Sequence, residues 1–308
     1  MRYRPIGQLD ASVVGLGCNN FGMRIDATQT KLVVDAAIDA GINYFDTAEG
    51  YGAGASEEYL GAAVRGRRDQ VLIATKWGML PTPDDDPPTG SAPAVRAAVD
   101  ASLSRLGTDY IDHYQYHRPD GRTPMAETMG ALAELVAEGK VREIGCSNVD
   151  AAQIAEAEAI AGDRGIPRFH TVQNHYSLLT RDPETDGVLD ACERYRVGFV
   201  PFFPLESGVL TGKYTFGEAA PEGTRLASMG DRAERFLNDE RAPRITAMNE
   251  WAEDAGHTLL EAAIAWLIAD ERVTSVISGA TKPEQVAANA AAATWVMSAA
   301  ERAELSAL

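Results

Sequence analysis

Short runs of apolar residues recur along the chain, and most are followed by a stretch in which hydrophobic positions have helical spacing. The runs are rich in Val, Ile, Phe and Tyr, which favour strands. They begin near Val13, Ile42, Val71, Tyr110, Val141, Phe169, Val197 and Val273. Successive starts lie 28 to 39 residues apart, except for 76 residues between the last two. The pattern therefore predicts eight strands that alternate with helices.

This alternation is typical of an α/β fold with a parallel sheet. Eight such units predict a (β/α)8 TIM barrel that forms one domain over residues 1–308. The segments YRPIG (residues 3–7) and SVVGLG (residues 12–17) predict an N-terminal β-hairpin at the bottom of the barrel. The widest interval predicts a long loop between strands 7 and 8. A doubly wound fold is disfavoured, because neither Gly15–Gly22 nor Gly50–Ser56 has the G-x-G-x-x-G spacing.

The charge of the chain narrows the classes of partner. It has 28 Lys+Arg against 45 Asp+Glu, a net charge of −17. This excess argues against nucleic-acid binding and against binding to an anionic membrane. Cys18, Cys146 and Cys192 show no metal-ligand spacing, and no apolar segment resembles a signal or a membrane span. We therefore expect a cytoplasmic protein with reduced thiols, no metal, no nucleic acid and no membrane partner.

Polar residues interrupt the apolar pattern where the predicted strands end, which is where barrel enzymes carry their chemistry. Asp46 ends strand two, Lys76 strand three and His117 strand four, and Tyr51 lies in the loop after strand two. A buried ammonium needs a partner, so we expect Lys76, one of five lysines, to pair with Asp46. Lys76 is then expected to lower the pKa of Tyr51 from about 10. The result is an acid–base tyrosine beside a neutral imidazole.

Each of these residues has an ordinary structural role when it is taken alone. Asp46 can cap the following turn, Tyr51 can be a loop aromatic, Lys76 can form a structural ion pair and His117 can bond a backbone carbonyl. Their joint placement on consecutive strands at one rim favours the functional interpretation.

Longer stretches around these residues resemble the aldo-keto reductase family. The matching strings are GINYFDTAEGYG–ASEEYLG (41–61), VLIATKWG (71–78), SLSRLGTDYIDHYQYHRPD (102–120), GKVREIGCSN (139–148), VQNHYSLL (172–179), PLESGVLTGKY (204–214) and SGATKPEQVAAN (278–289). They run in family order over nearly the whole chain. Within the family, the chain is most similar to bacterial reductases related to potassium-channel beta subunits.

The resemblance implies an enzyme, an NADP(H)-dependent oxidoreductase that acts on CH–OH groups and carbonyls. It implies reduction of a small-molecule aldehyde or ketone to the alcohol by direct hydride transfer from NADPH, preferred over NADH. Asp46, Tyr51, Lys76 and His117 correspond to the catalytic tetrad. In this tetrad Tyr51 donates the proton, Lys76, held by Asp46, lowers the pKa of Tyr51, and His117 orients the carbonyl oxygen. No oligomeric state follows from the sequence.

The resemblance also implies a set of cofactor-binding residues. Those expected around the nicotinamide are Asp46, Ser147, Asn148, Gln173 and Phe202; those expected along the pyrophosphate and phosphates are Pro204, Leu205, Ser207, Gly208, Leu210, Lys213 and Arg225; those expected at the adenosine end are Gly279, Thr281, Lys282, Gln285 and Asn289. The preference for NADPH depends on Lys213, Arg225 and Lys282. The free N–H groups of the helix that starts at Lys282 independently favour an anion there.

A separate group of residues is expected to contact the substrate. Asn19, Asn20, Phe21 and Trp77 are expected to contact the substrate, and loop 79–90 is a candidate lid. No particular carbonyl compound is implied. Two alternatives stay open: an NADP(H)-binding regulatory or interaction subunit with little turnover, and an unrelated barrel lyase or isomerase that uses Lys76 as a Schiff base.

Overall fold

The computed structural model describes residues 1–79, 82–83, 86–238 and 240–308. Its main sheet has eight strands, all parallel, in the order β10-β3-β4-β5-β6-β7-β8-β9. Their bounds are β3 Val14–Gly17, β4 Tyr44–Asp46, β5 Leu72–Trp77, β6 Ile111–Tyr116, β7 Val141–Ser147, β8 Phe169–Gln173, β9 Gly198–Phe199 and β10 Val276–Gly279. Each strand starts within three residues of a predicted apolar run.

The two outer strands of this order lie next to each other, so the sheet closes into a barrel. Phe199 at the end of β9 forms a parallel bridge with Val273, just ahead of β10. The N–H of Thr274 donates to the carbonyl of Phe199 at 2.7 Å, and the N–H of Ile277 donates to the carbonyl of Pro201 at 3.2 Å. The predicted (β/α)8 barrel is confirmed.

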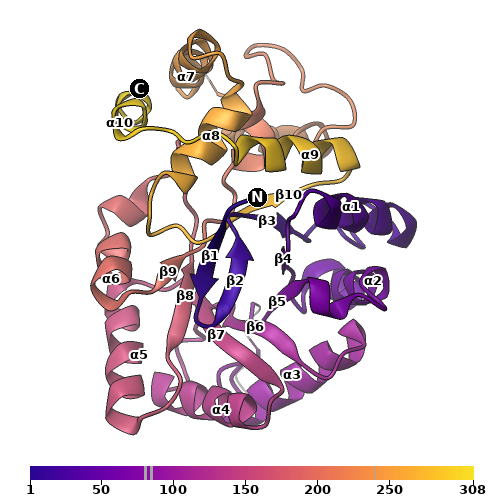
Figure 1. Ribbon diagram of the computed structural model, residues 1–308, viewed down its shortest axis with the longest axis vertical. Coiled ribbons are helices and arrows are strands. Elements are labelled where there is room, and N and C mark those ends of the chain that lie inside the picture. Colours follow the sequence, from indigo (N-terminus) through magenta and orange to yellow (C-terminus); the bar gives the residue numbers. More distant parts are fainter. Residues whose placement is uncertain (80–81, 84–85, 239) are drawn as a thin grey trace.

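Helices surround the barrel (Figure 1). Their bounds are α1 Ala27–Asp39, α2 Ala55–Ala63, α3 Ala92–Leu106, α4 Met125–Ala137, α5 Ala151–Arg164, α6 Val188–Tyr195, α7 Ala242–Asp254, α8 Leu259–Ile268, α9 Pro283–Ala292 and α10 Ala299–Ala307. Short 3-10 segments are η1 Tyr51–Gly54, η2 Arg68–Gln70, η3 Asp182–Glu184, η4 Glu206–Thr211 and η5 Ala227–Arg235. The interval predicted as a long loop is only partly loop, since it contains α7 and α8. Among the described residues, no helix has the length and apolarity needed to cross a bilayer.

The N-terminal hairpin is present, but its second strand differs from the prediction. β1 (Tyr3–Ile6) pairs antiparallel with β2 (Leu9–Ser12), whereas the predicted partner segment, SVVGLG, provides barrel strand β3. The physical reason is burial, because β3 is buried along its whole length, as strands of parallel sheets are. Ile6 and Leu9 pack with Tyr44 of β4. The hairpin of β1 and β2 covers the amino-terminal end of the barrel (Figure 1).

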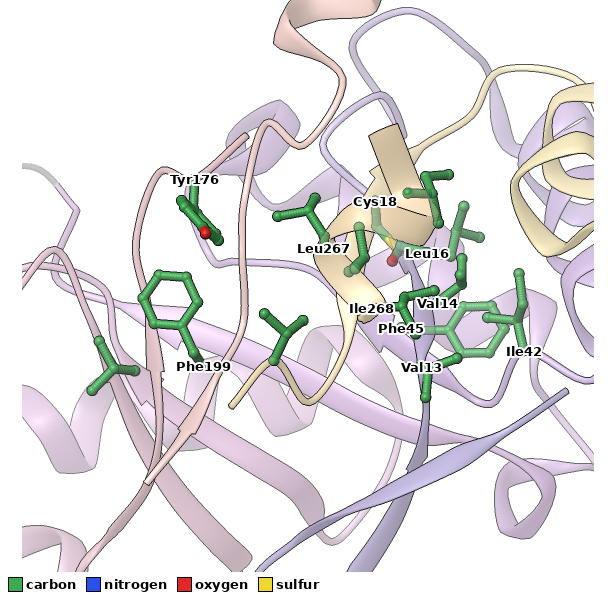
Figure 2. Packing of buried hydrophobic residues seen from close by; sticks show 14 of the residues in the cluster. Val13, Val14, Leu16, Cys18, Ile42, Phe45, Tyr176, Phe199, Leu267 and Ile268 are labelled. Carbon is green, nitrogen blue, oxygen red and sulfur yellow. The ribbon is translucent and has the colours of Figure 1, made fainter. Parts of the chain in front are cut away.

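The main apolar core lies between the barrel and its helices. Helix α8 is apolar on nearly every side, and eight of its ten residues are buried, as expected for a helix without a polar face. Figure 2 shows Leu267 and Ile268 of α8 among buried side chains of β3 and β9, including Leu16 and Phe199. Each such aliphatic side chain contributes roughly 1.5–3 kcal/mol on burial.

A buried histidine lies inside the barrel, below the carboxyl ends of the strands. His113 of β6 is fully buried, and its ring nitrogens lie 2.8 Å from the Tyr44 hydroxyl and 3.0 Å from the Thr171 hydroxyl. Gly145 makes room for this ring, since a Cβ at that position would lie 2.5 Å from His113 Nε2. Burial lowers the pKa of His113 to about 3, so the ring is neutral at physiological pH.

Candidate active site

A cavity of about 820 Å³ opens at the carboxyl ends of the barrel strands. Its wall includes the last residues of β3, β4, β8 and β10 and residues that follow β6, β7 and β9. Because all the strands run in one direction, side chains far apart in the sequence meet at this rim. This is the rim at which the sequence predicts the chemistry.

A buried ion pair forms beside this cavity. Lys76 Nζ lies 2.6 Å from Asp46 Oδ2 and donates to the carbonyl of Thr47 at 2.8 Å. The other carboxylate oxygen of Asp46 accepts from the amides of Gln115 at 3.1 Å and Gln173 at 3.0 Å. Burial acts to lower the pKa of Lys76, but attraction to Asp46 outweighs it, so that pKa is raised. The predicted pairing of Lys76 with Asp46 is confirmed, and Lys76 is a cation.

Tyr51 is held beside this pair by a tight turn. Gly52, Ala53 and Gly54, which follow it, all have left-handed backbone conformations. The Lys76 ammonium lies 5.4 Å from the centre of the Tyr51 ring. Lys76 acts to lower the pKa of Tyr51, as the sequence predicts, but the net pKa does not fall below its usual value. Burial raises the pKa of Tyr51, and the opposing field of Lys76 only reduces that rise.

His117 faces Tyr51 across the cavity. The two rings are nearly perpendicular, with centroids 6.0 Å apart. Burial, followed by the charges of Lys76 and Arg118, lowers the pKa of His117 to about 3, so the predicted neutral imidazole is confirmed. Its Nδ1 is buried without a hydrogen-bond partner among the described residues. Asn148 donates to the backbone carbonyl of His117 at 2.9 Å and ties the end of β7 to this loop.

Most of the expected cofactor residues line the same cavity. They are Asp46, Asn148, Gln173, Phe202, Pro204, Leu205, Ser207, Gly208, Lys213, Arg225, Gly279, Thr281, Lys282, Gln285 and Asn289. Lys282 is the N-cap residue of α9 and makes no capping hydrogen bond through its side chain. Among the described residues, no group of three or more His, Cys, Asp or Glu is placed to hold a metal ion.

The loop after β9 is held by a buried carboxylate. Glu206 is 2 % exposed, and its Oε1 accepts from Ser177 at 2.7 Å and Thr180 at 2.9 Å and lies 2.7 Å from His175 Nε2. Burial acts to raise the pKa of Glu206, but these hydrogen bonds outweigh it and lower that pKa. The His175 ring in turn stacks on Phe202, with centroids 5.5 Å apart. Glu206 therefore fixes both the loop and the aromatic ring at the cavity wall.

The comparisons with known proteins agree with this geometry. The family model described as "Aldo/keto reductase family" matches residues 13–308. The chain belongs to the aldo/keto reductase family. The match covers the barrel strands and the loops that carry Asp46, Tyr51, Lys76 and His117, so the family assignment and the geometry concern the same part of the chain.

Relatives of this chain in the family include named reductases and a potassium-channel subunit. The chain is 34% identical to L-glyceraldehyde 3-phosphate reductase of Escherichia coli K12, over 94% of this chain and 86% of that protein. It is 34% identical to a probable voltage-gated potassium channel subunit beta of Arabidopsis thaliana, over 94% and 90%. It is 32% identical to the NADH-specific methylglyoxal reductase of Escherichia coli K12, over 95% and 93%. The protein is thus an oxidoreductase of this family, similar to reductases of carbonyl compounds.

Two expected cofactor residues of this aldo/keto reductase do not line the cavity. Ser147 is buried, and its hydroxyl donates to the carbonyl of Gln173 at 2.7 Å. Asn148 also donates to the Ser147 hydroxyl, at 3.0 Å. Leu210 is fully buried in the apolar core. Ser147 therefore positions Asn148 and Gln173, and Leu210 anchors η4 from below.

The expected substrate residues divide in the same way. Asn19 and Asn20 line the cavity, but Phe21 and Trp77 are buried away from it. Trp77 stacks on Tyr114 and Tyr116 of β6, with centroids 4.6 and 4.9 Å away. Side chains alternate along a strand, so Trp77 faces the helices where Lys76 faces the barrel axis. In the candidate lid, loop 79–90, residues 80–81 and 84–85 lie outside the described residues.

Several residues of the site were missed in the sequence. Gln115 bonds Asp46 from β6, and Arg24 and Arg118 line the cavity. Gln115 lies two positions before His117, and strand alternation was a sufficient signal to place both on the barrel-facing side. For Arg24, in a loop after β3, no local pattern shows the direction of the side chain.

Proposed function

We propose that the protein reduces an aldehyde or ketone to the alcohol with NADPH, and that Tyr51 donates the proton. The observation that carries the proposal is the buried Lys76–Asp46 ion pair beside Tyr51, in a cavity that His117 also lines. This pair holds a cation next to a buried phenol and opposite a neutral imidazole. A bound nicotinamide cofactor supplies the hydride that the carbonyl carbon receives.

The side chains of the site provide the proton that the carbonyl oxygen receives. Tyr51 transfers its O–H proton to the carbonyl oxygen as negative charge develops there, and solvent later reprotonates the phenolate. Lys76 stabilises that phenolate, and Asp46, held by Gln115 and Gln173, keeps Lys76 in place. His117 is neutral and donates an N–H to the same oxygen, which orients the carbonyl without adding a second charge.

The remaining polar groups of the cavity fit a nicotinamide dinucleotide cofactor and its phosphates. The Asn148 and Gln173 side chains offer amides for a carboxamide. Ser278 also lines the cavity, and its hydroxyl is buried without a hydrogen-bond partner among the described residues. Phe203, Glu206, Ser207 and Gly208 have left-handed backbone conformations, the type from which anion-binding backbone nests are built. This donor set supports a cofactor with phosphates.

The preference for NADPH over NADH rests on cations at the far end of the cavity. Lys282 stands at the N-terminus of α9, where the helix dipole disfavours a cation unless an anion binds beside it. We predict that Lys282→Ala raises the Kd of NADPH about tenfold, because one charge-assisted hydrogen bond contributes roughly 1.5 kcal/mol or more, and changes the Kd of NADH less than twofold. Titration of cofactor fluorescence measures both constants. The control is Lys31→Ala, an exposed lysine paired with Asp35 on α1; equal losses for both cofactors would contradict the assignment.

The similarity to channel beta subunits favours a second candidate, an NADP(H)-binding interaction subunit with little turnover. Cofactor fluorescence and the oxidation of NADPH with a panel of aldehydes separate the two. Binding with turnover supports the reductase, and binding without turnover supports the interaction subunit. The Schiff-base alternative has little support, because Lys76 Nζ is buried and engaged by Asp46 and Thr47; a borohydride-trapped adduct at Lys76 would revive it.

A further inference from the structure

Three arginines line the cavity, and no carboxylate of the described residues pairs with them. Arg24 follows β3, Arg118 follows β6 and Arg225 follows η4, and all three are cavity-lining residues. Within the described chain, none of their side chains forms an ion pair or donates a hydrogen bond. Arginines elsewhere do find partners, as Arg68 does with Asp112 and Arg105 with Glu57.

These arginines gather at the reacting end of the cavity. Arg118 directly follows His117 in the chain. The loop that carries Arg24 packs against the turn after Tyr51, since a Cβ on Gly52 would lie 3.0 Å from the carbonyl oxygen of Phe21. The Arg225 guanidinium lies 5.5 Å from the centre of the Phe203 ring, next to Phe202.

The carboxylates that line the cavity do not neutralise the positive charge of these arginines. Asp46 is already engaged by Lys76 and by two amides. Glu284 belongs to the first turn of α9, beside Lys282. Glu222 lies in the same loop as Arg225 and forms no ion pair among the described residues. With Arg225 set aside for the cofactor phosphates and the charge of Glu222 counted, Arg24 and Arg118 still leave an excess of one positive charge. In a chain of net charge −17, such a local excess is a binding feature for an anion.

The burial of Arg225 adds to this conclusion. Burial lowers the pKa of Arg225, and the charge of Arg24 lowers it further. Two like charges that lie close together without a counter-ion oppose each other. A cofactor phosphate at Arg225 relieves part of this repulsion, and the Arg24 guanidinium keeps donors that are suited to a second oxyanion, a carboxylate or a phosphate.

We propose that the substrate of this reductase carries, besides its carbonyl group, a carboxylate or phosphate that Arg24 and Arg118 bind, with Arg225 beside them. The inference rests on the proposed reductase function and adds the charge class of its substrate. Because Arg225 is also expected to reach cofactor phosphates, the test depends on Arg24 and Arg118 alone.

The experiment compares aldehydes that differ in one charged group. NADPH oxidation is followed with glyceraldehyde 3-phosphate against glyceraldehyde, and with succinic semialdehyde against butanal. The measured quantity is the ratio of kcat/KM for the charged member to that for the neutral member of each pair. We expect this ratio to exceed 10 for at least one pair in the natural protein, and the pair with the larger ratio distinguishes phosphate from carboxylate.

Arginine variants then locate the binding site. Arg24→Ala and Arg118→Ala should each lower the preferred ratio at least tenfold, the loss expected for one charge-assisted hydrogen bond. They should leave the Kd of NADPH within twofold of its original value. Arg65→Ala is the matched control, because Arg65 is exposed and lies outside the cavity. Raising the salt concentration should lower the ratio in the natural protein, since added ions screen charges that remain open to solvent.

The outcomes separate this inference from the function on which it rests. Equal turnover of charged and neutral aldehydes, with ratios that the two variants do not alter, would overturn the inference and leave the reductase function intact. Absence of turnover with every aldehyde would refute the reductase function, and the inference would fall with it.

Discussion

Replacing Lys76 by Met removes the cation of the buried pair and keeps most of its volume. In the folded protein, Lys76 Nζ is the donor to Asp46 Oδ2 at 2.6 Å and to the Thr47 carbonyl at 2.8 Å. The substitution leaves both oxygens buried without that donor, at a cost of roughly 1–3 kcal/mol each. The sum agrees with the loss of about 3–5 kcal/mol that follows when one partner of a buried ion pair is removed.

The assay is urea-induced unfolding of the natural protein, Lys76→Met, Asp46→Asn and the double variant. We expect Lys76→Met to lower the free energy of unfolding by about 3–5 kcal/mol. The double-variant cycle should show a coupling energy of about 2 kcal/mol or more between the two sites. The control is Lys31→Met, whose side chain is 61% exposed in its pair with Asp35; it should lose about 0.5 kcal/mol or less. A loss below about 1 kcal/mol for Lys76→Met would refute the buried pair as described.

Two further predictions concern the barrel interior. Gly145→Ala should lower the free energy of unfolding by about 1–3 kcal/mol, because the new Cβ would lie 2.4 Å from the Thr171 hydroxyl and 2.5 Å from His113 Nε2. The control is Gly130→Ala in α4, where a Cβ meets nothing within 4 Å; it should raise the free energy of unfolding by about 0.5–1 kcal/mol. Equal unfolding midpoints for the two variants would contradict this packing. The folded-state pKa values of His113 and His117, both about 3, lie below the unfolded value of 6.5, so their neutral forms stabilise the protein fully above pH 6.5 and progressively less as the pH falls toward 3. At pH 5.5 each histidine should lower the free energy of unfolding by about 1.4 kcal/mol relative to its contribution above pH 6.5. The variant His113→Asn should therefore show a weaker pH dependence of the urea midpoint than the natural protein. An unchanged pH dependence would contradict a neutral, buried His113 ring.

The strand pattern was readable from the sequence because each barrel strand is a short apolar run before a helix. Runs such as that at Val141 became strands at the predicted residue, and β10 begins three residues after its predicted start. The second strand of the hairpin was harder to predict from the sequence. The run at Val13 is apolar enough for a fully buried strand, and the hairpin strand Leu9–Ser12 has only weak alternation.

The candidate site was partly predictable for the same reason. Asp46, Lys76 and His117 stand out as polar residues where apolar strands end, and parallel strands bring such ends together. Trp77 was misplaced although strand alternation already points it away from Lys76. The pKa of Tyr51 was not predictable, because the sequence shows its charged neighbours but not how deeply the phenol is buried. The direction of Arg24 depends on loop packing, which no local pattern encodes.

The most direct test of the proposed chemistry is Tyr51→Phe, which removes one hydroxyl and keeps the ring. The measurement is kcat for NADPH oxidation with the best aldehyde, together with the Kd of NADPH from cofactor fluorescence. General acid help from one residue is worth about 10²–10⁴-fold. We predict that kcat falls by about this factor while the Kd stays within twofold. A kcat within threefold of the natural protein would contradict the role of Tyr51 as the proton donor.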